Sequence, residues 1–191
     1  MDELLSMSTR RLQGTKIILL VFILVGLGAY ANVLSSFFVA DDFYLIQAVS
    51  ERGPFGIWSR TRGGYFRPLI SLSLFVERKL WGLNPLGYHV INVVVHSFSS
   101  FLVFRISSLF MNAKGTQRDD LHILSLLSGF TFLLLASHAE PVAWISGRTD
   151  VFATFFCMAS LYAYLLHRGC SRRLHLLLSG IFFYKRSRGL C

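Results

Sequence analysis

The chain is organised around one stretch, Ser35-Ser36-Phe37-Phe38-Val39-Ala40-Asp41-Asp42, in which a long apolar run gives way to two adjacent carboxylates. The run itself, residues 17–39, carries no charged side chain, and Arg10, Arg11 and Lys16 precede it. At ~1.5 Å of rise per residue, a helix of this length crosses a hydrocarbon core of ~30 Å. We therefore expect an uncleaved membrane span with a cytoplasmic N-terminus, and prefer it to the alternative, a cleaved signal peptide.

Composition places the whole chain in the membrane class. Of its 191 residues, 53% are hydrophobic and 15% are charged, and the mean hydropathy is +0.54. In a soluble domain, about a quarter of the residues are charged. We attribute the net charge of +9 to basic residues beside membrane spans and to contacts with membrane lipid. No zinc-finger or RNA-binding pattern accompanies this charge, so we expect no nucleic-acid partner.

Further apolar segments predict an all-α fold, a polytopic helix bundle of about four spans and a truncated fifth. The later spans are expected at residues 88–110, 121–137 and 151–166, with the short fifth at 174–184. The domain organisation then follows as a cytoplasmic tail (1–16), a transmembrane region (17–184) with external loops 41–87 and 138–150, and a basic tail (185–191). That last tail indicates a truncated or frameshifted end.

Two features of the transmembrane region stand out. Apolar residues recur with helical spacing from Leu69 to Leu80, which predicts an amphipathic helix lying in the membrane interface. Polar residues recur on one face of the span 88–110, and such groups face a bundle interior or a cavity. They are His89, Asn92, His96, Ser99 and Ser107. This polar stripe motivates one alternative function, a membrane transporter component.

The adjacent carboxylates of Asp41 and Asp42 could serve as a general base or ligate a hard divalent cation. The simpler alternative is that they cap the N-terminus of a following helix, and spacing alone does not decide between these roles. Arg67 and Arg148 could grip a phosphate. Interface snorkelling or a local ion pair is the simpler explanation for either arginine.

The acidic pair after the first span, opening a long external loop, resembles the GT-C class of membrane glycosyltransferases. Two stretches are similar to the N-terminal membrane region of the transmembrane and tetratricopeptide-repeat (TMTC-like) mannosyltransferases, which are related to protein O-mannosyltransferases, and their bacterial relatives. One is Tyr65-Phe66-Arg67-Pro68-Leu69 followed by residues 80–92 and His96, and the other is residues 138–150. The similarity covers most of residues 17–166. The chain departs from the family pattern at Leu135-Ala136, where His-Pro is common, and in having fewer spans.

The resemblance implies transfer of a sugar from a polyprenyl-phosphate donor to a protein or glycan acceptor on the periplasmic or lumenal side. It assigns the catalytic base, or the group that positions acceptor and metal, to Asp42 first and Asp41 second. Substrate binding falls on Arg67, His138, Glu140, Arg148 and Asp150. A divalent cation, Mg²⁺ or Mn²⁺, would be held by Asp42 and Glu140.

This interpretation requires the two acidic loops to lie close together on one face of the membrane. Because the donor site of the class includes later helices, we expect the chain to be inactive alone. The lack of targeting and glycosylation signals favours the bacterial inner membrane over the endoplasmic reticulum. A non-catalytic membrane scaffold is the remaining alternative.

Overall fold

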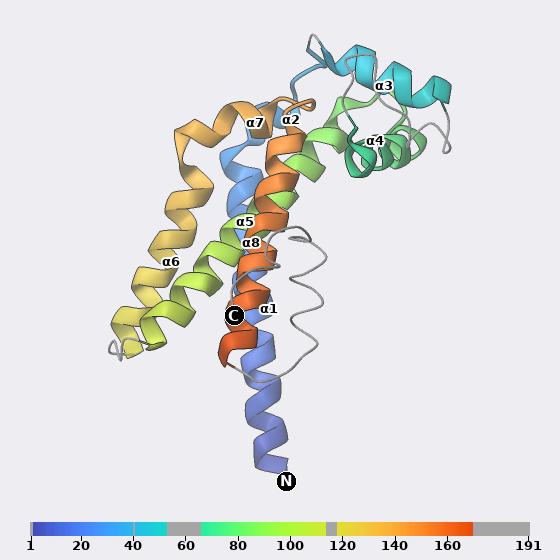
Figure 1. Ribbon diagram of the computed structural model, residues 1–191. Helices are drawn as coiled ribbons and strands as arrows, with labels where there is room; N and C mark the ends of the chain where they lie inside the picture. The colour runs from blue at the N-terminus through green and yellow to red at the C-terminus, as the bar shows by residue number, and fades with distance from the viewer. Residues whose placement is uncertain (1, 40, 53–65, 114–117, 170–191) are drawn as a thin grey trace, which may run out of the picture. The chain divides into compact units, whose positions relative to one another are not determined.

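The computed structural model describes residues 2–39, 41–52, 66–113 and 118–169, and the regular elements of these ranges are helical (Figure 1). In chain order they are α1 (Asp2–Ala29), α2 (Ala31–Leu34), α3 (Asp41–Arg52), α4 (Pro68–Trp81), α5 (Pro85–Ala113), α6 (Arg118–Leu134), η2 (Ala136–His138), α7 (Ala139–Ala143) and α8 (Arg148–Gly169). The predicted all-α class is confirmed. The expected fifth segment, 174–184, and the tail 185–191 lie outside the described residues.

Two of the described helices are long and apolar enough to cross a membrane, over Pro85–Met111 and Arg148–His167. A third span is counted if Asp120–Leu134 and Ala136–Ala143, which meet at a bend of 45°, are taken as one broken span. The bend lies at Leu135, whose extended backbone (φ −65°, ψ 122°) ends α6. These three correspond to the spans expected at 88–110, 151–166 and 121–137, and the protein is an integral membrane protein.

The first expected span differs from the prediction, because helix α1 ends at Ala29 rather than continuing to Val39. Tyr30 leaves the helical region (φ −101°, ψ 18°), and its carbonyl accepts the N–H groups of Val33 and Leu34 at 2.9 and 3.3 Å to start the short helix α2. The hydroxyls of Ser35 and Ser36 then donate to the carbonyl of Asn32 at 3.0 and 3.4 Å. Such local hydrogen bonds compete with helix continuation. Residues 36–39 have no regular secondary structure.

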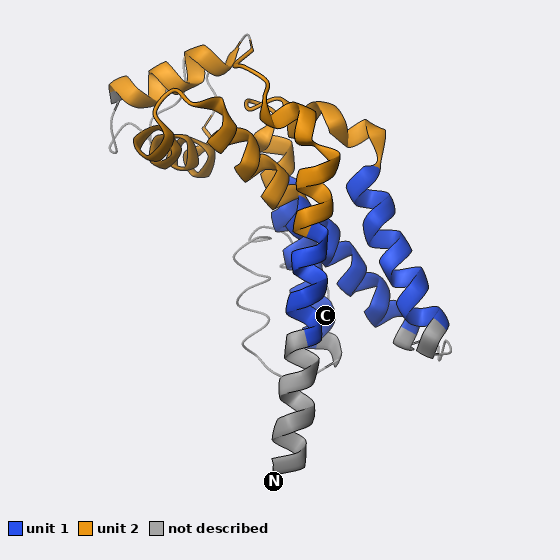
Figure 2. Cartoon of the chain, turned by 180° about the vertical axis from the view of Figure 1, so that it is seen from behind, with its two compact units in different colours: residues 1–22, 97–134, 153–191 blue, residues 23–96, 135–152 orange. Residues whose placement is uncertain are grey.

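Contacts divide the chain into two compact units (Figure 2). Unit 1 comprises residues 1–22, 97–134 and 153–191, and unit 2 comprises residues 23–96 and 135–152. In unit 1 the fully buried ring of Phe22 stacks on Phe130, with ring centroids 4.5 Å apart, and meets Phe101 edge-on at 6.2 Å. Gly129 makes this approach possible, because a Cβ there would lie 2.6 Å from the Phe22 ring.

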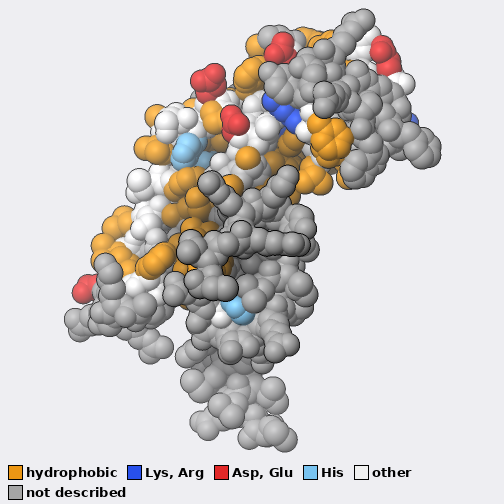
Figure 3. Space-filling view, viewed as in Figure 1, with side chains coloured by type: hydrophobic (Ala, Val, Ile, Leu, Met, Phe, Trp, Pro, Cys, Tyr) orange, Lys and Arg blue, Asp and Glu red, His pale blue; other side chains and the backbone are white. Residues whose placement is uncertain are grey.

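The outer surface of unit 1 is apolar where a helix meets the membrane. Ile123, Leu127 and Leu134 of α6 are 58%, 56% and 54% exposed, and hydrophobic side chains line α6 on the face seen in Figure 3. Arg105, in the α5 span, is half-buried and donates to the hydroxyl of Tyr162 from Nε at 3.1 Å and from Nη2 at 2.8 Å. A charge at membrane depth is tolerated when it is paired in this way.

In unit 2, helices α3 and α4 pack side by side (Figure 1) over a core of aliphatic and aromatic side chains. The buried members of this core are Phe38, Ile46, Val49, Leu74, Tyr88 and Ile145. Helix α4 confirms the helix predicted over 69–80, and it begins with Pro68 at its first turn, where a missing N–H costs nothing. Its buried face carries Leu74 and Glu77, whereas Leu69, Leu72, Val76 and Leu80 are exposed, as an interface helix requires.

Candidate functional site

Asp42 lies in the first turn of α3, and its carboxylate reaches back to the chain before the helix. Oδ2 accepts the backbone N–H of Val39 at 3.0 Å, and the N–H of Asp42 donates to the Val39 carbonyl at the same distance. The carboxylate and N–H of Asp42, the second residue of α3, thus pair with the N–H and the carbonyl of one residue just before the helix. Asp42 therefore fixes the start of α3, and Asp41 beside it is exposed.

The other carboxylate oxygen of Asp42 binds the second acidic loop. Oδ1 accepts the backbone N–H of Ser146 at 2.8 Å and the Ser146 hydroxyl at 2.6 Å. Short hydrogen bonds to an ionised acceptor are stronger than those between neutral groups. These bonds join the two acidic loops directly, as the interpretation of the sequence requires. Asp42 is only 2% exposed.

A pocket of about 400 Å³ opens beside Asp42. Its walls are Ser36, Phe37, Val39, Asp42, Glu140, Ala143 and Trp144. The volume falls within the range of small-molecule sites, and apolar walls with a few placed polar groups are typical of them. An ionised carboxylate offers about four acceptor positions, and the protein uses three of those on Asp42. The remaining position, on Oδ2, leaves Asp42 able to accept a hydrogen bond from a bound hydroxyl.

The pocket brings together the two residues expected to hold a metal, Asp42 and Glu140. Glu140 is exposed in the first turn of α7. Across the described ranges, no group of three or more His, Cys, Asp or Glu side chains is placed to hold a metal ion. Mg²⁺ prefers six oxygen ligands in near-octahedral geometry. Two carboxylates, one of them already bound by backbone and hydroxyl donors, do not make such a site.

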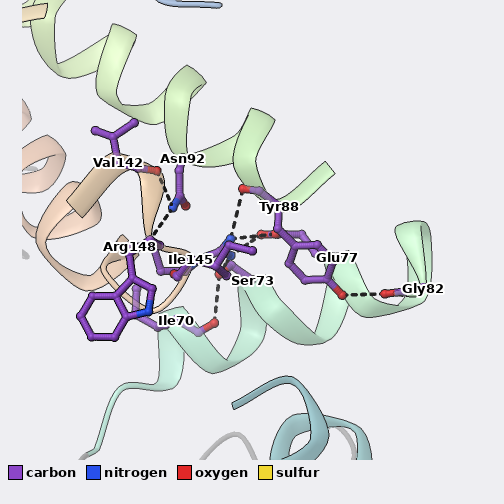
Figure 4. Close-up of polar contacts among 10 residues, drawn as sticks. Ile70, Ser73, Glu77, Gly82, Tyr88, Asn92, Val142, Ile145 and Arg148 are labelled. Atoms are coloured by element: carbon purple, nitrogen blue, oxygen red, sulfur yellow. Dashed lines mark hydrogen bonds and ion pairs between the residues drawn. The ribbon is translucent and has the colours of Figure 1, made fainter. Parts of the chain in front are cut away.

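Arg148, expected at the substrate, is instead enclosed by unit 2 (Figure 4). Nη1 and Nη2 pair with the two carboxylate oxygens of Glu77 at 2.6 and 2.9 Å. Nη1 also donates to Ser73 Oγ at 3.0 Å, Nη2 to the Tyr88 carbonyl at 3.4 Å, and Nε to the Ile145 carbonyl at 3.3 Å. These bonds use all five N–H groups of a guanidinium. The geometry favours the local ion pair over contact with a substrate phosphate.

Glu77 was missed by the sequence analysis. Burial raises the pKa of the Glu77 carboxyl above its ordinary value, although the hydrogen bond and the charge of Arg148 act in the opposite direction. A signal was present, since Glu77 follows Leu74 by three positions and so shares the inward face of an apolar helix. A carboxylate there requires a buried cation, and Arg148 supplies it from 71 positions away.

The other expected substrate residues lie apart from the pocket lining. Arg67, half-buried before α4, donates from Nη1 to the Thr149 hydroxyl at 3.1 Å, which brings it beside the start of α8. His138 packs edge-on against His96, with ring centroids 5.3 Å apart. Asp150 is exposed in the first turn of α8, where a carboxylate stabilises a helix N-terminus.

The polar stripe of α5 faces the interior, as expected: His89 and Asn92 are 1% and 0% exposed. Nδ2 of Asn92 donates to the carbonyls of Val142 and Trp144, both at 3.3 Å, and Nε2 of His89 lies 3.2 Å from the Ser36 carbonyl. The first of these bonds is visible in Figure 4. These two side chains therefore hold the backbone at Ser36, just before the first acidic loop, and the backbone of the second acidic loop.

Comparison with known proteins gives consistent relatives. The chain is 32% identical over 163 residues to protein O-mannosyl-transferase TMTC2 of Mus musculus, a match that covers 78% of this chain and 18% of the relative. It is 31% identical over 154 residues to protein O-mannosyl-transferase Tmtc1 of Drosophila melanogaster, covering 73% and 16%. The chain thus spans less than a fifth of the length of these curated relatives. No family model matches the chain, and no solved structure does.

Proposed function

We propose that this chain, which belongs to the TMTC family of protein O-mannosyl-transferases, forms one wall of the active site of a membrane mannosyltransferase. One observation carries the proposal. A buried aspartate with a spare acceptor position faces a pocket at the junction of both acidic loops. The acceptor is a protein hydroxyl, in keeping with the names of the relatives.

Asp42 is the proposed general base. The acceptor hydroxyl donates to the free position on Oδ2, while Val39 and Ser146 hold the carboxylate still. As the bond from the acceptor oxygen to the anomeric carbon forms, the hydroxyl proton passes to Asp42. The bond from the anomeric carbon to the donor phosphate oxygen breaks, and its electron pair stays on the phosphate.

The proposed donor is a sugar on a polyprenyl phosphate. A leaving group anchored in lipid requires the reaction to occur at the membrane surface, and the exposed apolar face of α4 fits that location. Contact with the donor phosphate is proposed for Arg67, whose guanidinium reaches Thr149 beside the second acidic loop. Glu140, which lines the same pocket from the second acidic loop, is proposed to orient the acceptor.

The side of the membrane is proposed to be the lumen of a eukaryotic compartment. The two relatives described above come from animals, Mus musculus and Drosophila melanogaster. The bacterial inner membrane, which the sequence favoured, finds no support in them. The lumenal side keeps both acidic loops opposite to the cytoplasmic N-terminus that Arg10, Arg11 and Lys16 indicate.

The test is a chimera in which residues 17–166 replace the matching region of the mouse relative. Microsomes that contain the chimera should transfer mannose from polyprenyl-phosphate mannose to a protein acceptor, with membrane insertion checked by protease protection. Transfer only from a nucleotide sugar would contradict the proposed donor. Loss of transfer in a correctly inserted chimera, while the unaltered relative stays active, would contradict the proposed site.

A further inference from the structure

A second pocket, of about 280 Å³, lies in unit 2 where α3 meets α4. Among the described residues its lining is largely aromatic and aliphatic, with one cation; these residues are Phe38, Phe43, Ile46, Gln47, Ser50, Arg78 and Leu83. None of these residues belongs to the wall of the Asp42 pocket. Neither the proposed reaction nor the relatives' names assigns this pocket a ligand.

The irregular segment after α2 contributes side chains to both pockets. Phe37 and Val39 line the Asp42 pocket, whereas Phe38 between them lines the second one. The rings of Phe37 and Phe38 lie with centroids 5.4 Å apart, and both lie near Phe43, at 5.9 and 5.7 Å. The two pockets are therefore adjacent along this segment and differ in charge, because carboxylates line the first and an arginine lines the second.

Arg78 is held in a defined position in the last turn of α4. Its Nε donates to the Ser50 hydroxyl of α3 at 3.2 Å. The terminal nitrogens have no hydrogen-bond acceptor among the residues that the structure describes. No carboxylate is among the described residues that line the pocket, and Glu51 of α3 accepts the side-chain N–H of Gln47 at 2.8 Å. The free fork of the guanidinium suits an anion with several oxygens, such as a phosphate.

The rim of the second pocket is apolar and exposed. Phe43 and Leu83, which line the pocket, are 50% and 60% exposed. The flanking residues Leu80, Trp81 and Leu86 are 67%, 45% and 50% exposed. A free phosphate would gain nothing from such a rim, whereas an acyl chain would bury it. The ligand that fits has an anionic head and an apolar tail.

We propose that this pocket binds the phosphate of an anionic glycerophospholipid of the surrounding membrane. The phosphate pairs with the terminal nitrogens of Arg78, and the acyl chains lie over Phe43, Leu83 and the exposed face of α4. The bound lipid fixes α3 and α4 at the membrane surface, next to the segment that forms part of the wall of the Asp42 pocket. This site stands whether or not the protein transfers mannose.

Native mass spectrometry of the full chain in detergent tests the site, with dioleoyl phosphatidic acid as the probe and dioleoyl phosphatidylcholine as the neutral lipid. The wild type should retain phosphatidic acid in preference to phosphatidylcholine. Arg78→Gln should weaken this binding at least tenfold. Lys79→Gln is the matched control: its ammonium lies over the Phe75 ring at 5.8 Å and does not line the pocket, so binding should persist.

Arg78→Lys keeps the charge and should retain part of the affinity, and circular dichroism checks that each variant has the helical content of the wild type. Equal binding by the wild type and a folded Arg78→Gln would overturn the proposal, as would an equal loss in Lys79→Gln. Binding of polyprenyl phosphate without binding of phosphatidic acid would also overturn it, because the occupant would then be the sugar carrier. Equally tight binding of inorganic phosphate would show that the apolar rim plays no part.

Discussion

The hydroxyl of Ser146 donates a 2.6 Å hydrogen bond to Oδ1 of Asp42, across 104 positions of sequence. With the Ser146 backbone N–H on the same oxygen and the Val39 N–H on the other, the carboxylate is held from the second acidic loop and from the segment before α3. A general base works best when its position is fixed before the substrate arrives. The same bonds link the start of α3 directly to the loop before α8.

Replacing Ser146 by Ala should remove one of the three hydrogen bonds to Asp42 and leave the backbone bonds in place. We expect a loss of about 1–2 kcal/mol in the free energy of unfolding. We also expect kcat in the chimera to fall more than KM changes, because the base becomes mobile while the pocket keeps its walls. Ser146→Thr, which keeps the hydroxyl, should restore kcat. Equal kcat for Ala and wild type would exclude a positioning role.

The ion pair between Glu77 and Arg148 should matter more for stability than any exposed pair. Its members are 4% and 0% exposed, so removing one leaves the other charged and buried. Glu77→Ala should cost about 3–5 kcal/mol, and replacing both by apolar residues (Glu77→Leu with Arg148→Met) should cost less than the two single changes added together. Thermal unfolding in detergent measures both. An additive double variant would show that the two residues do not interact.

The raised pKa of Glu77 gives a pH dependence of defined sign. Between about pH 4.5, its ordinary value, and the higher pKa in the fold, the folded protein holds a proton that the unfolded chain has released. The contribution of Glu77 to stability is therefore complete below that window and falls as pH rises through it. The advantage in unfolding temperature of the wild type over Glu77→Gln should shrink from about pH 4 to about pH 7. A growing advantage would mean that Arg148 outweighs burial.

Gly129→Ala should destabilise unit 1, because the added Cβ would lie 2.6 Å from the ring of Phe22. Overpacking of this kind costs about 1–3 kcal/mol. Gly28→Ala is the matched control: nothing lies within 4 Å of its Cβ, and alanine favours a helix over glycine. Unfolding temperatures should fall for the first and stay equal or rise for the second. A neutral Gly129→Ala would show that α1 and α6 approach less closely.

Much of the fold was predictable from local pattern. The spans at 88–110 and 151–166 and the helix at 69–80 follow from apolar length and spacing, and the structure has them. The break at Tyr30 was not predictable from hydropathy, because it depends on backbone and serine hydrogen bonds within an apolar run. Hydropathy averages over such a turn.

The site was predictable only in part. The family resemblance assigned Asp42 and Glu140 to one site, and these two residues do line one pocket. Arg148 belonged to the same motif, yet its partner Glu77 lies 71 positions away, and only tertiary structure shows that the pair closes on itself. Ser146 lies inside the stretch 138–150 but was not predicted as a site residue, because an uncharged serine does not stand out in a sequence. Long-range hydrogen bonds decide these roles, and sequence spacing does not contain them.

The most direct test of the proposed base compares two neighbouring carboxylates in the chimera. Asp42 is buried at the pocket, whereas Asp41 is exposed in the same helical turn, so Asp41→Asn is the matched control for Asp42→Asn. Removing a general base lowers the rate by about 10²–10⁴. We expect kcat for mannose transfer to fall at least a hundredfold in Asp42→Asn and to stay within about threefold of wild type in Asp41→Asn. Undiminished transfer by a correctly inserted Asp42→Asn would contradict the account.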